Sequence, residues 1–415
     1  MSSDSSEVTV STLGEAPASI SKLSASPDPS EAPSTTVLVA GGGLCGLLCG
    51  LALSALGVDC HIYEQRGTPG PSQSGEIAYL ITEELDKFLA AHKVAVDRTR
   101  VRTAGRQVLA DDGDVQLQDS RSQDYISYEA LHSALLECFP QDNYHAASKV
   151  TLVDASHPDV VVLQLDSGER IAGHLLVAAD GVTSSVRQQL LPNCQPAYAG
   201  YLAWRGVAAL DSLSAEVQHH LADKGTLYKG ANLHMLVHPL PCSSSSSAAA
   251  GEGQPLAWTW FNNQAAEELP GLLLDAGLRV YPHAVPVGRL RLSPAVADAV
   301  AAAAAEALPQ PLAELVASST RCMGVAAVSD MALPCHALGR VAFAGEAGCV
   351  ARPHGSSSVD KALQDAVSLA DTLKAAKFSV DRALHAWSLQ RVPQSVALCR
   401  AAAAAGNRLQ GTEEC

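Results

Sequence analysis

The chain has 415 residues, 47% hydrophobic and 17% charged, which is enough to bury a large core in two or three domains. Its formal net charge of −15 argues against a nucleic-acid partner and against an anionic membrane surface, because no basic stripe is present to neutralise phosphates. The eleven cysteines are scattered, with no C-x-x-C pair, which is typical of free thiols in the cytoplasm or another reducing compartment.

The first 58 residues divide into a polar segment and an apolar segment. Residues 1–35 are rich in Ser, Pro and Thr and are acidic, so we expect a disordered tail. Residues 35–58 carry no charge and are long enough to span a bilayer. Three consecutive glycines near the start and the absence of basic flanks instead favour a strand at 36–40, a helix and a second strand at 58–63, and we predict no membrane span.

The turn between this strand and this helix carries the spacing G-x-G-x-x-G, at Gly41, Gly43 and Gly46. The first glycine allows a tight turn, the second lets the backbone approach a pyrophosphate, and the third permits close packing of helix on strand. Glu64 ends the second strand, where a carboxylate accepts hydrogen bonds from a ribose diol. These four residues predict a dinucleotide site without distinguishing FAD from NAD.

Two further turns follow apolar strands later in the chain. Helices are predicted at 82–92, 128–138 and 359–376, and strands at 159–166 and 170–179. Asp180-Gly181 directly follows the second of these strands, and Gly345-Glu346 follows the apolar run 341–343. Since the carboxyl ends of parallel strands share one edge of a sheet, we expect both turns to lie beside Gly41.

The middle of the chain has a different pattern. Residues 199–207, 225–238 and 256–262 are short candidate strands that carry aromatic residues, and they predict an antiparallel sheet. Residues 242–253 are of low complexity and predict a flexible loop. We therefore expect an α/β nucleotide-binding domain at 36–190 and 331–415, interrupted by a substrate-binding sheet domain at 191–330.

With these motifs in place, the sequence resembles the single-component FAD-dependent aromatic hydroxylases, the class A flavoprotein monooxygenases, from residue 36 to about 405. Within that family it resembles the subgroup around 2,6-dihydroxypyridine 3-hydroxylase. The matching stretches are YISYEALHSALLECFPQDNYH (125–145), AGYLAWRG (199–206), LAWTWFNN (256–263) and VARPHGSSSVDKA (350–362).

The resemblance implies a Rossmann-like FAD-binding domain with GxGxxG, DG and GD-type motifs. It also implies FAD as cofactor, NADPH or NADH as electron donor, O2 as co-substrate, and hydroxylation of an electron-rich aromatic or heteroaromatic small molecule through a flavin C4a-hydroperoxide. No metal site is expected. A homodimer is one assembly that the sequence leaves open.

The site residues that the resemblance implies fall into three groups. FAD is expected to contact Gly41, Gly43, Leu44, Gly46, Glu64, Val150, Asp180, Gly345, Glu346, Ser358 and Val359. Pro353 is expected along the isoalloxazine, and His354 either exchanges protons near the flavin or is a turn histidine bonded to backbone. Substrate is expected to contact Tyr201, Trp204 and Trp258.

Three residues depart from the family pattern. Glu346 replaces an Asp, Ser358 replaces a Gly, and Glu76 lies in a stretch that is normally neutral near the flavin. These departures motivate an alternative from a different class, a degenerate FAD-fold protein that binds flavin weakly and serves as a binding or scaffold module.

Overall fold

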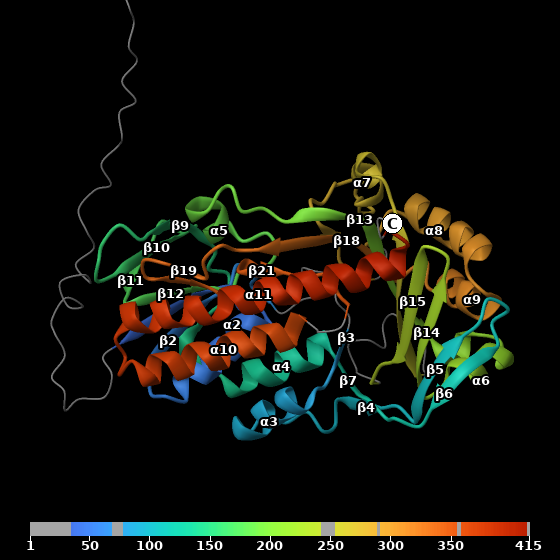
Figure 1. Cartoon of the computed structure of the whole chain (residues 1–415), viewed down its shortest axis with the longest axis horizontal. Helices are drawn as coiled ribbons and strands as arrows, with labels where there is room; N and C mark the ends of the chain where they lie inside the picture. The colour runs from blue at the N-terminus through green and yellow to red at the C-terminus, as the bar shows by residue number, and fades with distance from the viewer. Residues whose placement is uncertain (1–34, 69–77, 242–253, 289–290, 355–357, 413–415) are drawn as a thin grey trace, which may run out of the picture.

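The structure, a computed structural model, describes residues 35–68, 78–241, 254–288, 291–354 and 358–412. The predicted tail, apart from its buried last residue Thr35, lies outside the described residues, as do the predicted loop at 242–253 and Glu76. Figure 1 shows two lobes, each built around a β-sheet, and a long C-terminal helix, α11 (Val380–Gln410), that runs from one lobe to the other.

The first lobe is built on a six-stranded sheet in the order β19-β20-β12-β1-β2-β8. Neighbouring strands are parallel except β19 with β20. The strands are β1 (Thr36–Ala40), β2 (Asp59–Tyr63), β8 (Tyr144–His145), β12 (Leu175–Ala178), β19 (Ala337–Leu338) and β20 (Val341–Phe343). The chain runs outward from β1 to β8 and then returns to the other side of β1, so the order reverses between β1 and β12. Ligands of open α/β sheets bind at the carboxyl ends of the strands beside such a reversal.

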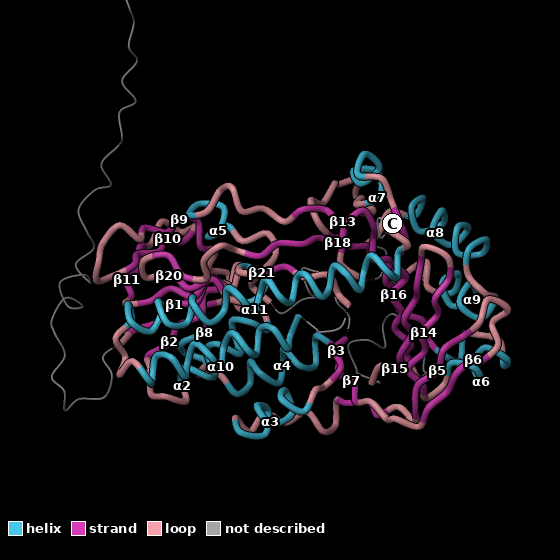
Figure 2. Tube along the Cα trace, in the orientation of Figure 1, coloured by secondary structure: helices cyan, strands magenta, loops and turns pink. Residues whose placement is uncertain are grey.

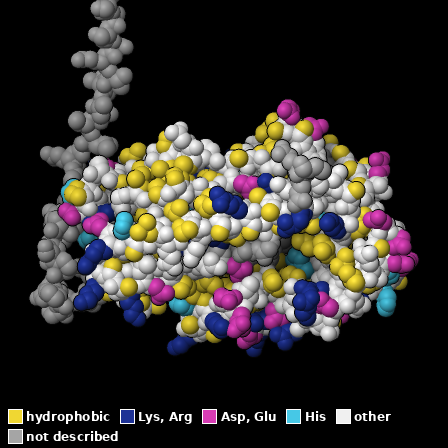
Figure 3. All heavy atoms as spheres, in the orientation of Figure 1, with side chains coloured by type: hydrophobic (Ala, Val, Ile, Leu, Met, Phe, Trp, Pro, Cys, Tyr) yellow, Lys and Arg dark blue, Asp and Glu magenta, His cyan; other side chains and the backbone are white. Residues whose placement is uncertain are grey.

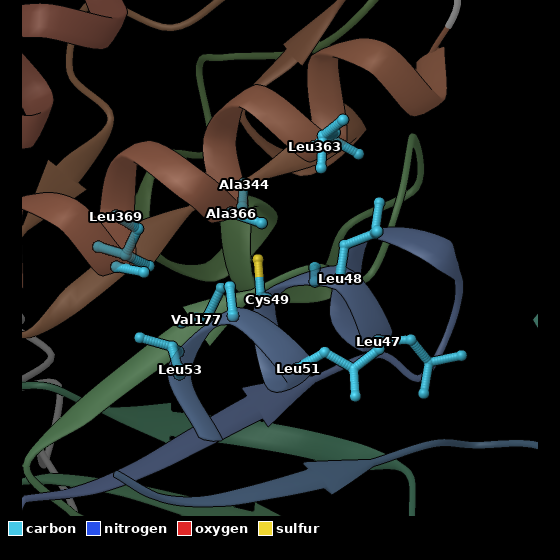
Figure 4. Close-up of a cluster of buried hydrophobic side chains, with 14 of the residues drawn as sticks. Leu47, Leu48, Cys49, Leu51, Leu53, Val177, Ala344, Leu363, Ala366 and Leu369 are labelled. Carbon is cyan, nitrogen blue, oxygen red and sulfur yellow. The ribbon is translucent and has the colours of Figure 1, made fainter. Parts of the chain in front are cut away.

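Helices cover one face of this sheet. They are α2 (Leu44–Ser54), α4 (Tyr128–Cys138), α10 (Ser358–Ala375) and the first half of α11. The sheet, α4 and α10 enclose α2, which explains why this helix carries no charge. Figure 4 shows Cys49 and Ala366 between α2 and α10, where small side chains let the two helices approach closely.

A small antiparallel sheet and a short helix cover the other face. They are β9 (Val150–Asp154), β10 (Val161–Leu165), β11 (Arg170–Gly173) and α5 (Ser185–Leu190). The continuous run predicted at 170–179 is therefore divided at His174 between two sheets, β11 in the small one and β12 in the large one.

The second lobe is a nine-stranded, mainly antiparallel sheet. In spatial order it contains β17 (Ala284–Val285), β18 (Met323–Ala332), β13 (Ala197–Ala209), β16 (Pro255–Asn263), β15 (Leu233–Pro239), β14 (Lys224–Gly230), β5 (Gly105–Leu109) and β6 (Val115–Asp119), with β21 (Cys349–Val350) paired to β18. The predicted antiparallel sheet is present, and the strand predicted at 225–238 is a hairpin of β14 and β15. Because β5 and β6 come from 105–119, the second sheet is not confined to residues 191–330.

Helices pack on the outer face of the second sheet (Figure 2). They bury the tryptophans of that face. They are α6 (Ala215–Leu221), α8 (Pro294–Ala307) and α9 (Gln310–Ser318), with the short α7 (Leu269–Leu272) at the edge of the lobe. A three-stranded sheet joins the two lobes, and its strands in spatial order are β3 (Ala78–Leu80), β7 (Asp124–Ser127) and β4 (Arg100–Arg102). Helix α3 (Glu83–Ala91) follows β3 in the chain and lies beside this sheet.

Side-chain caps explain why two of the predicted helices begin where the sequence placed them. Thr82 accepts a hydrogen bond from the backbone of Leu85 at the start of α3, and Ser127 accepts one from Ala130 at the start of α4. Within the described ranges, no helix is both long and apolar enough to cross a membrane.

Candidate cofactor and active site

Three turns converge at the carboxyl edge of the parallel sheet. They follow β1, β12 and β20, which are adjacent strands, and they contain Gly41–Gly43, Asp180–Gly181 and Gly345–Glu346. All three turns line one cavity of about 320 Å³. The sequence prediction that these turns share one edge is confirmed.

The glycines of the first turn are required by close backbone approach. Gly41 has φ +104°, and a Cβ there would lie 2.5 Å from the carbonyl oxygen of Ala179. A Cβ on Gly46 would lie 1.9 Å from the carbonyl oxygen of Gly41, so Gly46 packs α2 against the turn and does not line the cavity. Gly43 caps α2 without a side chain, and the space beside its Cα is open apart from Tyr128 Oη at 3.9 Å. The N-terminal N–H groups of α2 therefore face a cavity without a side-chain cap.

Glu64 is held in a fixed orientation at the end of β2. Its Oε2 accepts a hydrogen bond from the backbone N–H of Gly42 (2.7 Å), and its Oε1 accepts one from that of Arg66 (2.9 Å). Each carboxylate oxygen can accept a further hydrogen bond, so Glu64 can bind hydroxyl groups in the cavity that it lines. Leu44 and Val150 are further lining residues, as the resemblance implied.

Asp180 has a buried oxygen that lacks a partner. Its Oδ2 accepts hydrogen bonds from Ser185 Oγ and from the backbone N–H of Val186, each at 3.2 Å. Its Oδ1 is buried and has no hydrogen-bond partner among the described residues. Burial raises the pKa of the carboxyl, against the smaller opposing effect of these hydrogen bonds. A hydroxyl or amide donor from a bound molecule would satisfy this oxygen.

The third turn is fixed by a buried ion cluster that sequence analysis missed. Gly345, at φ +57°, donates its N–H to Asp365 Oδ2 (2.8 Å) and accepts from Lys361 Nζ at its carbonyl (2.8 Å). Asp365 also pairs with Lys361 (2.5 Å) and with Arg391 (2.7 Å). The i,i+4 spacing of Lys361 and Asp365 was the available signal, but such pairs usually lie on solvated helix faces.

A second cavity, of about 350 Å³, adjoins the first. Tyr79, Glu346 and Ser358 line both, so the two cavities meet at these residues. In Figure 3 the surface is hollowed between the lobes, where hydrophobic and histidine side chains are visible. Ser358 begins α10 at this junction.

Tyr201 and His354 lie together beside the second cavity. Tyr201 Oη is 2.7 Å from His354 Nε2, and both side chains are buried and pack against Phe261. Burial, and secondarily the charge of Arg352, lowers the pKa of His354 to about 4. Pro353 and Phe261 line the cavity, and Val359 lines the first one.

Trp204 and Trp258 require a correction. Both are buried in the core between the second sheet and its outer helices, where Trp204 Nε1 donates to Asn262 Oδ1 (2.8 Å) and Trp258 Nε1 donates to Ser319 Oγ (2.9 Å). Neither lines either cavity within the described part of the chain. Alternation along the strands instead directs their neighbours Arg205 and Thr259 into the second cavity.

Over the described ranges, no group of three or more His, Cys, Asp and Glu side chains is placed to hold a metal ion.

Comparison with known proteins relates this geometry to a family. A family model described as "FAD binding domain" matches residues 34–221, and one described as "FAD binding domain-like" matches residues 198–330. The 2,6-dihydroxypyridine 3-monooxygenase of Paenarthrobacter nicotinovorans is 26% identical over 381 residues, covering 90% of this chain and 91% of that protein.

Solved structures establish the same fold. The 2,6-dihydroxypyridine-3-hydroxylase from Arthrobacter nicotinovorans superposes with a TM-score of 0.83 at 24% identity, covering 93% of this chain and 95% of that one. Klebsiella pneumoniae HpxO, solved with FAD and uric acid, has a TM-score of 0.73 at 20% identity, covering 92% and 90%. The predicted fold class is thereby confirmed. The resemblance to FAD-dependent aromatic hydroxylases expected from the sequence is also confirmed, because the chain contains a matched FAD-binding domain and is similar over 90% of its length to a 2,6-dihydroxypyridine 3-monooxygenase.

Proposed function

We propose that this monooxygenase uses NADPH or NADH and O2 to hydroxylate an electron-rich aromatic or heteroaromatic small molecule. The observation that carries the proposal is the junction of the two cavities at Tyr79, Glu346 and Ser358. One cavity has the donors and acceptors that a dinucleotide needs, and the other is large enough for a single aromatic ring system. A flavin bound across the junction would face the substrate.

The residues of the first cavity fit FAD. The uncapped N-terminus of α2 offers N–H groups and a favourable dipole to the pyrophosphate. Glu64 accepts from the ribose hydroxyls, and the unpartnered Asp180 Oδ1 accepts a donor further along the molecule. Glu346 lines both cavities and would accept from a sugar or ribitol hydroxyl, and Val359 and Pro353, which line one cavity each, would lie beside the ring.

When bound and reduced, the flavin supplies the activation of O2 and the electrophilic oxygen. The chain's own contribution is positioning and exclusion of water. The N-terminus of α10 begins at the junction with Ser358, so its dipole stabilises negative charge that develops there. Apolar side chains of the second cavity, among them Phe261, Val328 and Pro353, keep water from the reacting oxygen. His354 is held by Tyr201 beside the cavity, and its lowered pKa keeps the imidazole neutral at physiological pH.

The test is a spectrum followed by an activity screen. The purified chain, reconstituted with FAD, is expected to show the visible absorbance of a bound flavin. It is expected to oxidise NAD(P)H faster with hydroxypyridines or phenols, and mass spectrometry is expected to find products with one added oxygen. A flavin that binds without any substrate-dependent NAD(P)H oxidation would instead support the alternative, a binding module. A chain that takes up no flavin would overturn both.

A further inference from the structure

Two cysteines from distant parts of the chain meet where α11 passes β21 (Figure 1). Cys349 is the first residue of β21, and Cys399 lies 50 residues further along the chain, in α11. Their Sγ atoms are 3.4 Å apart. Because β21 pairs with β18 of the second sheet, this contact lies between that sheet and the helix that joins the lobes.

The pair can be reached from outside the core. Cys349 lines the second cavity, together with Val350, Ala351 and Pro353, which follow it in the chain. Cys399 is partly exposed on the α11 side. A small reagent that enters the cavity or approaches α11 therefore meets one of the two thiols without unfolding the protein.

The two thiols have different acidities. The hydrogen bond from Cys399 lowers the pKa of Cys349 to about 7, against the opposing effect of burial, and the charge of Lys361 adds to this lowering. The same hydrogen bond, with burial, raises the pKa of Cys399. At neutral pH Cys349 is thus partly a thiolate, and Cys399 is the thiol that donates to it. A reactive thiolate beside a second thiol is the arrangement of a redox-active cysteine pair.

A second pair of neighbouring cysteines provides an internal comparison. Cys45 and Cys49 interact within α2, and this hydrogen bond and burial raise the pKa of Cys49. Residues one helical turn apart have Cβ atoms about 5–6 Å apart, whereas a disulfide requires about 3.5–4.5 Å. The pair in α2 therefore cannot form a disulfide without distortion of the helix, whereas Cys349 and Cys399 come from separate elements that can approach each other.

We infer that Cys349 and Cys399 form a redox-active dithiol, which hydrogen peroxide converts into a disulfide between β21 and α11. The Cys349 thiolate attacks one peroxide oxygen, so an S–O bond forms, the O–O bond breaks, and the hydroxide that leaves takes a proton from solvent to become water. Cys399 then attacks the Cys349 sulfur. The S–S bond forms, the S–O bond breaks, and the hydroxyl group leaves with the thiol proton as a second water. Two electrons pass from the sulfurs to the peroxide, and a dithiol reductant reverses the reaction by exchange.

The disulfide adds a covalent tie to a helix that is otherwise held by side-chain contacts. In the first lobe these contacts are Ser395 with His336 and Arg391 with Asp365. Closing a loop of this length restricts the unfolded chain, so the oxidised protein is the more stable form. Since the residues after Cys349 form part of the cavity wall, oxidation also fixes that wall to α11. This chemistry needs only the fold and an added peroxide, so it stands apart from the proposed function.

The test is a titration of the reduced, FAD-loaded protein with hydrogen peroxide after free reductant is removed. Remaining thiols are then blocked, and peptides are identified by mass spectrometry. We expect the first product to be a peptide pair joined through Cys349 and Cys399, lighter by two hydrogens. It should form about 10-fold faster than oxidation of Cys138, a partly exposed thiol whose pKa burial raises. The oxidised protein is expected to unfold about 3–5 °C higher, and dithiothreitol should reverse both changes.

Single variants separate the roles of the two thiols. Cys399→Ser cannot form the disulfide, so we expect peroxide to leave a sulfenic acid on Cys349 that dimedone traps. Cys349→Ser removes the thiolate, so Cys399 should remain a thiol at the same peroxide concentration. Cys138→Ser is the control, and it should form the same linkage with the same rise in Tm as the wild type.

Oxidation of Cys138 ahead of the pair would overturn the inference, as would a Cys45–Cys49 linkage in place of the expected one. A linkage between Cys349 and Cys399 that leaves Tm unchanged would contradict the tie between β21 and α11. The wild-type titration requires no substitution, so it decides the matter even if a serine variant does not fold.

Discussion

Asp365 is the residue on which the third turn depends. It is fully buried in α10, and its two oxygens bind the N–H of Gly345, the ammonium of Lys361 and the guanidinium of Arg391. Burial opposes ionisation of this carboxyl, but the charges of Lys361 and Arg391 outweigh that penalty and hold its pKa below the ordinary value. Removing the carboxylate would leave two buried cations facing each other without a counter-charge.

Asp365→Asn is therefore expected to lower the free energy of unfolding by about 3–5 kcal/mol at pH 7. A carboxyl whose pKa is depressed in the folded state stabilises the protein above its unfolded pKa, about 3.9, and this contribution is lost as pH falls through the folded value. Thermal unfolding at several pH values should show a gap in Tm between wild type and variant that is full at pH 7 and shrinks below about pH 4. Asp371→Asn, an exposed change on the same helix, is the control. A gap that does not change with pH would contradict this account.

At the residue scale, sequence reasoning succeeded where the chemistry is local. The positions of Gly41, Glu64, Asp180 and Glu346 follow from strand ends, because a turn after a parallel strand must lie at the sheet's carboxyl edge. Arg205 could not be assigned in this way. Alternation along β13 and β16 predicts that their side chains divide between two faces of the sheet. It does not predict which face packs against helices and which lines the cavity, because that depends on α8 and α9, which lie more than 85 residues from Arg205 along the chain.

Helix α2 is the element that couples the glycine turn to the core. It is buried against the sheet, α4 and α10, so it cannot move away from the turn to make room for a larger residue. The third glycine of the motif lies at its contact with β1, and the cavity side of the turn is formed by the first two.

Gly46→Ala is thus expected to displace the start of α2 from the turn. The added Cβ would overlap the carbonyl oxygen of Gly41, so we expect a loss of about 2 kcal/mol or more in unfolding free energy, and FAD binding about 100-fold weaker. FAD fluorescence on titration measures the affinity, and thermal unfolding measures the stability. Gly271→Ala, at a helical site with no atom within 4 Å of the added Cβ, should leave both unchanged. A Gly46 variant that binds FAD normally would contradict the packing role.

At the element scale, the helices α3, α4 and α10 were predicted to within two residues, and α3 and α4 begin at side-chain caps. Strand membership was harder to predict. The run at 170–179 reads as one apolar segment, yet β11 and β12 enter different sheets, and β5 pairs in parallel with β14 across more than 110 residues. Such long-range pairings leave no local pattern in the sequence.

At the scale of the whole molecule, α11 joins the two lobes. Its 31 residues span about 46 Å. Near its middle, Ser395 Oγ contacts His336 Nε2 (2.8 Å) in the first lobe. At its end Gln410 contacts His234 Nδ1 (2.9 Å) and accepts from Asn263 (3.0 Å) in the second lobe. Figure 1 shows this helix crossing the boundary between the lobes.

Gly406 allows α11 to approach the substrate cavity. A Cβ there would lie 2.6 Å from Tyr201 Oη and 3.0 Å from both Arg352 Cδ and His354 Cδ2. Gly406→Val should therefore displace the Tyr201–His354 pair and, through its contacts with Phe261, the wall of the second cavity.

We expect Gly406→Val to raise KM for the aromatic substrate about 10-fold while the affinity for FAD changes by less than about 3-fold, because the glycine turn and Glu64 are remote from this contact. Steady-state NAD(P)H oxidation gives KM, and FAD titration gives the affinity. Ala404→Val, an exposed change two residues away in the same helix, separates the contact from the general effect of a β-branched residue. Equal effects of the two substitutions, or a parallel loss of FAD, would show that α11 stabilises the fold without shaping the substrate cavity.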